Sequence, residues 1–152
     1  MLLGAALQEL KIHQSKLVRL SNLRYDTFNY LENKTIEVPF DDLNAEIQQL
    51  MHEIRNLKVR IHKTNSNSML EVEGTTMSIQ ELIILIGDLR SELSRLESLR
   101  PQGPVYLGGQ AVEYLPQKKK DEMAAMISEV EQRKADLDKL LQAKNWATEL
   151  LE

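Results

Sequence analysis

The stretch FDDLNAEIQQLMHEIRNLKVRIHKT, residues 40–64, decides the fold of this chain. Its apolar residues recur at alternating spacings of three and four residues: Phe40, Leu43, Ile47, Leu50, Ile54, Leu57 and Ile61, followed by Thr64. A repeat of 3.5 residues places these side chains in one narrow stripe along a helix, and such a stripe must be covered by a partner helix. The stretch therefore predicts one rod of a helical bundle or coiled coil.

Three other stretches show the same spacing, from Leu3 to Leu31, from Ile79 to Leu96 and from Met123 to Leu151. A helix of about 30 residues is about 45 Å long, so these elements are rods rather than the short helices of a compact fold. Ser78 and Glu81 have the spacing of a capping box at the start of the third helix. The sequence predicts an all-α chain, a single helical domain over residues 1–152. Its helices are expected at about 2–31, 40–66, 78–99 and 117–149, as an elongated antiparallel four-helix bundle or coiled-coil hairpins.

Two segments between the predicted helices are not helical. Residues 69–77 alternate briefly around Gly74 and predict a small extended turn. Residues 105–115 predict a small β-hairpin insertion between the third and fourth helices, because Gly108 and Gly109 supply the positive φ angles of a two-residue turn. An isolated hairpin is marginal in water, so we expect it to pack on the helices or to pair with another subunit.

Composition excludes several classes of protein. The 152 residues include no cysteine, which excludes disulfide-stapled scaffolds and thiolate metal sites. Aromatic residues make up only 5% of the chain, which argues against a β-sandwich or barrel. A net charge of −4 offers no basic field, so no nucleic-acid partner is expected. The most apolar stretch, residues 79–89, is shorter than the ~20 residues of a membrane span. We expect a cytoplasmic protein, although rearrangement on a membrane stays open.

No set of residues predicts catalytic chemistry. The three histidines, His13, His52 and His62, lack the repeated glutamate and histidine pairs of a metal-binding bundle. No serine stands in a nucleophile elbow, and Gly108-Gly109 lacks the context of a phosphate loop. The sequence therefore predicts no catalytic, cofactor-binding or metal-ligating residue and no cofactor, and it disfavours an enzyme.

Several polar residues fall on the apolar stripes, among them His13, Arg24, Arg133 and Lys144. A polar residue buried in such a stripe fixes the register of the paired helices, which is one interpretation of this pattern. Alternatively, the arginines mark where the stripe leaves the core, with their charged ends in water. A pocket that such residues line would bind an anion.

Two local stretches, IHKTNS at residues 61–66 and NWATEL at residues 145–150, resemble conserved blocks of the septicolysin-like family of small bacterial helical proteins. This resemblance implies a helical fold, and the family name implies a cytolysin. The Gly- and Pro-rich segment 101–116 departs from the family pattern. The polar residues in and near these stretches have two interpretations, as helix caps and end packing or as a shared polar pocket: Thr64, Asn65, Asn145, Trp146 and Thr148.

The leading functional prediction is a non-enzymatic homo-oligomer, an assembly or interaction module that associates through helix faces or through the β-hairpin. One alternative is a cytolysin or another membrane-acting protein. A second alternative is an enzyme that binds a small molecule or an anion at the end of the bundle. The sequence identifies no ligand.

Overall fold

The computed structural model describes all residues, 1–152, and its main elements are four long helices. They are α1 (Leu3–Thr27), α2 (Phe40–Asn67), α3 (Ile79–Ser98) and α4 (Lys120–Asn145). A first hairpin, β1 (Met69–Val72) and β2 (Thr75–Ser78), joins α2 to α3, and a second, β3 (Val105–Leu107) and β4 (Gln110–Val112), joins α3 to α4. The prediction of a mostly helical chain with four helices is confirmed. Both α1 and α4 are shorter than predicted.

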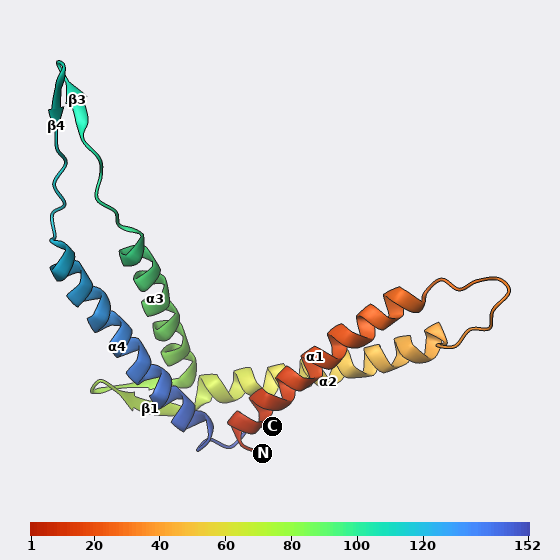
Figure 1. The fold of residues 1–152 in the computed structure, drawn as a ribbon. Helices are drawn as coiled ribbons and strands as arrows, with labels where there is room; N and C mark the ends of the chain where they lie inside the picture. The colour runs from red at the N-terminus through yellow and green to blue at the C-terminus, as the bar shows by residue number, and fades with distance from the viewer.

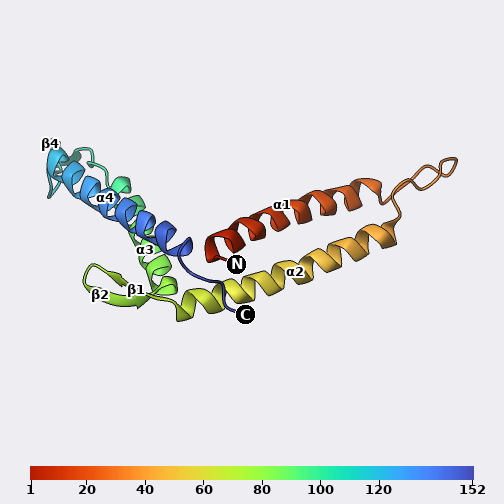
Figure 2. The same ribbon diagram turned by 90° about the horizontal axis from the view of Figure 1, so that it is seen from below.

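The four helices form two antiparallel pairs that diverge from a common junction, with α1 against α2 in one arm and α3 against α4 in the other (Figures 1 and 2). This arrangement differs from a single bundle in which all four helices share one core. The reason is that each apolar stripe is only one seam wide, so that one partner helix covers it. The β1–β2 hairpin also separates α2 from α3, which therefore does not fold back along α2.

The core consists of three small clusters rather than one centre. The α1–α2 arm contains Leu20, Leu43, Ile47, Leu50 and Ile54. The α3–α4 arm contains Val72, Leu82, Ile86, Leu89 and Leu137. The junction contains Leu3, Ala6, Leu57, Ile61, Ile79 and Leu150. The stripe predicted for α2 is confirmed from Leu43 to Thr64, where all its positions are buried, but its first position, Phe40, is exposed. Only 21 of the 152 residues are buried, as expected of paired rods with a single layer of core.

The β1–β2 hairpin sets the direction in which α3 leaves α2. β1 and β2 are antiparallel, and the two residues of their turn, Glu73 and Gly74, have φ angles of 49° and 81°. Ser78 ends β2 and caps α3: its hydroxyl accepts a hydrogen bond from the Glu81 amide at 3.2 Å, and the Glu81 carboxylate accepts one from the Ser78 amide at 2.6 Å. The predicted capping box is confirmed, and strand passes into helix without a loop.

The second hairpin projects beyond the helical part of the α3–α4 arm (Figure 1). Val105 pairs with Val112, and the turn residues Gly108 and Gly109 have φ angles of 57° and 83°. Val105 is half-buried and the other strand residues are exposed. The connection between α1 and α2, residues 28–39, occupies the far end of the other arm. Each arm therefore ends in a non-helical tip. None of the four helices combines the length and apolar character needed to cross a membrane.

Candidate functional site

The polar residues predicted near the end of α2 lie at the junction, where Thr64, Asn65 and Asn145 are buried. The Thr64 hydroxyl donates to the carbonyl of Arg60 at 2.8 Å and accepts from the amide of Leu151 at 2.9 Å. It therefore joins the end of α2 to a residue 87 positions further along the chain. The Asn65 side-chain oxygen is buried without a hydrogen-bond partner.

The segment after α4, residues 146–152, lies between the start of α1 and the end of α2. The Leu3 amide donates to Thr148 and the Leu150 amide donates to the carbonyl of Met1, both at 2.8 Å. Further along the segment, the Arg60 guanidinium donates to the carbonyl of Leu151 at 3.1 Å, and the Lys63 ammonium donates to the backbone oxygen of Glu152. These bonds join the segment that follows α4 to the start of α1 and to the end of α2.

Trp146 packs its ring on the first turn of α1. A methyl group added at Gly4 would lie 2.6 Å from the indole, so this contact requires a residue without a side chain. The Thr148 hydroxyl donates within its own segment, to the carbonyl of Lys144 at 2.8 Å. All five predicted residues thus belong to the junction region, but both threonine hydroxyls have structural partners. These contacts favour the interpretation as caps and end packing, and the shared pocket stays a prediction.

The residues predicted to set helix register have different environments. His13 is half-buried with its Nδ1 atom lacking a partner, and the half-buried Arg24 donates to the side chain of Asn44 at 2.7 Å. The buried position predicted for Arg133 is wrong, because its side chain is 45% exposed and forms two hydrogen bonds with Glu73, at 2.8 and 2.7 Å. The neighbouring stripe positions, Val130 and Leu137, both pack in the α3–α4 core, whereas the Arg133 guanidinium points out of it and binds the carboxylate of Glu73 in the β1–β2 turn.

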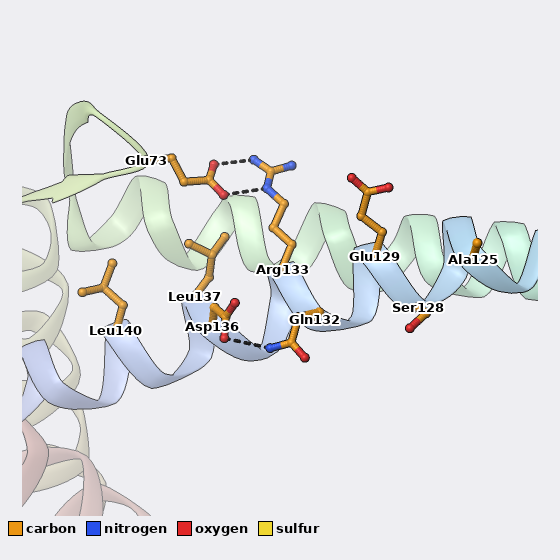
Figure 3. Close-up of a pocket in the computed structure, with 9 residues that line it drawn as sticks. All are labelled: Glu73, Ala125, Ser128, Glu129, Gln132, Arg133, Asp136, Leu137 and Leu140. Carbon is orange, nitrogen blue, oxygen red and sulfur yellow. Dashed lines mark hydrogen bonds and ion pairs between the residues drawn. The ribbon is translucent and has the colours of Figure 1, made fainter.

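An open groove runs along α4 beside this ion pair (Figure 3). It is lined by Glu73, Arg133, Ser128, Gln132 and Leu137 among others. The hydrogen bonds from Arg133 lower the pKa of Glu73, and the same contact raises the pKa of Arg133. Each charge is already compensated, so an anion would have to displace Glu73 to bind Arg133. No nucleophile is paired with a base here, and no cluster of three or more histidine or acidic side chains could hold a metal ion.

The tips of the two arms carry exposed aromatic and aliphatic side chains that the sequence analysis did not predict. We define the loop tip as residues 24–43 and the hairpin tip as residues 95–123; each comprises the connection with the adjoining helical turns. Six of the seven aromatic residues lie in these tips, and all six are exposed: Tyr25, Phe28, Tyr30, Phe40, Tyr106 and Tyr114. Exposed leucine and isoleucine side chains accompany them, among them Leu31, Ile36, Leu107 and Leu115. The signal that could have found them was the position of the aromatics relative to the predicted helix ends.

The architecture defines a class of mostly helical proteins built from two diverging antiparallel arms. Within it, the chain belongs to the family described as "Family of unknown function (DUF6847)", which matches residues 11–150. The fold is similar to a crystal structure described as that of a functionally unknown conserved protein from Corynebacterium diphtheriae. That similarity has a TM-score of 0.80 at 21% sequence identity and covers 99% of both chains. No curated protein matches the sequence.

Proposed function

We propose that this protein is an assembly or interaction module that self-associates. The observation that carries the proposal is its exposed surface of 11350 Å². A compact monomer of 17.5 kDa is expected to expose about 7,900 Å². One copy therefore leaves about 3,500 Å² more surface in water than its mass requires.

That excess is large in comparison with protein interfaces. A specific interface buries about 800 Å² on each partner, so the excess would supply more than one such contact per copy. Part of it is apolar, because large hydrophobic side chains are exposed at both tips, for example Tyr25 and Leu31 in the loop tip and Tyr106 and Leu115 in the hairpin tip. Large exposed apolar side chains that lie close together are typical of interaction sites.

Sedimentation equilibrium between about 1 and 100 µM tests the proposal. Equilibrium measurements report mass independently of shape, which matters because an elongated monomer elutes early from a sizing column. We expect an average mass that rises above the 17.5 kDa of one chain as the concentration increases. A mass that stays at one chain over the whole range would refute self-association.

The other predictions have weaker support. A ligand-binding enzyme has no evident site, because Arg133 is held by Glu73 and the Thr64 hydroxyl is used within the junction. The septicolysin-like resemblance and the membrane-acting role that its name implies stay predictions.

A further inference from the structure

The two tips are both apolar but differ in charge. The loop tip contains five acidic and two basic residues, whereas the hairpin tip contains five basic and four acidic residues. The contrast persists when the helical turns are left out. Residues 28–39 contain two acidic residues and one basic residue, and residues 99–119 contain one acidic residue and three basic ones. The loop tip is therefore net negative and the hairpin tip net positive by either definition.

Both tips expose large side chains to a similar extent. In the loop tip, Tyr25, Tyr30 and Leu31 are 83%, 60% and 67% exposed. In the hairpin tip, Tyr106, Leu107 and Leu115 are 73%, 60% and 86% exposed. Exposed tyrosine and leucine beside complementary charge form the kind of surface that protein interfaces use, with aromatic anchors inside a polar rim.

We propose that the loop tip of one copy docks on the hairpin tip of a second copy. This inference rests on the self-association proposed above and identifies the surfaces that make the contact. The tips stand at the far ends of diverging arms, so the two tips of one chain do not meet (Figure 1). Contacts between identical tips are disfavoured because they would bring like net charges together, whereas unlike tips attract.

The hairpin tip also gains stability from such a contact. Two strands of three residues each are marginal in water and leave unpaired backbone groups at both edges. A partner surface that covers the exposed Tyr106 and Leu107 side chains would remove apolar area from water. The contact joins two different surfaces, and every copy carries one tip of each kind. The assembly therefore either closes, as a reciprocal dimer or a ring, or grows by the addition of further copies.

Paired variants test this inference by complementation. The loop variant is Tyr30→Ser with Leu31→Ser, and the hairpin variant is Tyr106→Thr with Leu107→Thr. All four side chains are exposed, so these changes leave the three core clusters intact, and threonine keeps the preference for strand. Circular dichroism checks that each variant keeps its helix content. The matched control is Ile12→Ser with Val18→Ser, two exposed α1 side chains in the middle of an arm.

Each tip variant alone should sediment at the mass of one chain, because every contact needs both kinds of tip. An equimolar mixture of the two variants should form a one-to-one dimer, since the intact hairpin tip of one meets the intact loop tip of the other. The control should assemble like the wild type. Assembly of the wild type should also weaken as salt is raised from about 0.05 to 0.5 M.

Three results would overturn the inference. Two of them leave self-association intact, and the third refutes self-association as well. If only one tip variant loses assembly, the contact joins like tips. If both tip variants assemble and the control does not, the helix faces make the contact, and self-association stands. If the wild type is a monomer, self-association itself fails. In that case, cosedimentation with vesicles of phosphatidylcholine and phosphatidylserine that both tip variants lose would assign the tips to lipid.

Discussion

The Thr64→Val substitution tests whether the C-terminal segment holds the junction together. Valine keeps the branched shape of threonine and has a methyl group in place of the hydroxyl group. In the folded protein that hydroxyl accepts from the Leu151 amide at 2.9 Å and donates to the carbonyl of Arg60 at 2.8 Å. The Arg60 carbonyl keeps its helical hydrogen bond in the variant, whereas the Leu151 amide loses its acceptor.

The expected cost follows from this difference. A buried donor left without an acceptor costs about 1–3 kcal/mol. Thr64 is completely buried but Leu151 is 38% exposed, so water can reach the freed amide after a small movement. We therefore expect the free energy of unfolding to fall by about 1–2 kcal/mol. In a protein of this size the melting temperature falls by about 2–4 °C for each kcal/mol.

Urea unfolding at one fixed protein concentration measures this loss, and Trp146 fluorescence reports on the same junction. Thr27→Val is the matched control, because the Thr27 hydroxyl donates to the carbonyl four residues earlier, at 2.7 Å, but accepts from no distant amide. We expect the control to change stability by less than about 0.5 kcal/mol. Equal losses in Thr64→Val and Thr27→Val would show that the contact with Leu151 does not stabilise the fold.

Three further predictions concern single contacts. Gly4→Ala should push the Trp146 indole away from α1, because the new methyl group would lie 2.6 Å from the ring; an emission maximum that stays in place would contradict this packing. Ser78→Ala should cost about 1 kcal/mol in thermal or urea unfolding, because α3 loses its cap; a variant as stable as the wild type would refute it. Arg133→Gln should raise the lowered pKa of Glu73 toward its ordinary value, measured by NMR titration of the carboxyl group. The stabilisation that the lowered pKa of Glu73 gives is present above the pKa of the unfolded state and is lost as the pH falls through the pKa of the folded state. An unchanged titration of Glu73 in the variant would contradict the ion pair with Arg133.

The helices themselves could be predicted from the sequence, but their pairing could not. The spacing from Leu43 to Thr64 predicts which face of α2 is buried, because periodicity depends only on the geometry of one helix. A narrow apolar stripe indicates that a partner helix is needed, but it does not indicate which helix that partner is. The division into two arms depends on where the chain turns after α2. There the Glu73-Gly74 turn and the Ser78 cap direct α3 away from it.

The candidate site shows the same limit. Thr64 and Asn145 were predictable as polar residues near helix ends, but the partner of Thr64 lies 87 positions away, and no local pattern marks such a pair. Arg133 occupies a stripe position and yet is exposed, because its guanidinium forms an ion pair with Glu73 in the β1–β2 turn. Tertiary contacts decided both cases.

The scarcity of aromatic residues gains a different meaning once their positions are known. As a count, 5% argues against folds whose cores need aromatic side chains. As a distribution, it places six of seven aromatic residues at the arm tips, where none of them contributes to the three core clusters. The arms fold with aliphatic seams alone. Two of these six, Phe28 and Phe40, pack edge to face with ring centroids 5.9 Å apart and so stabilise the loop tip within its own chain. The tyrosines of both tips are exposed, and the docking proposed above would cover them.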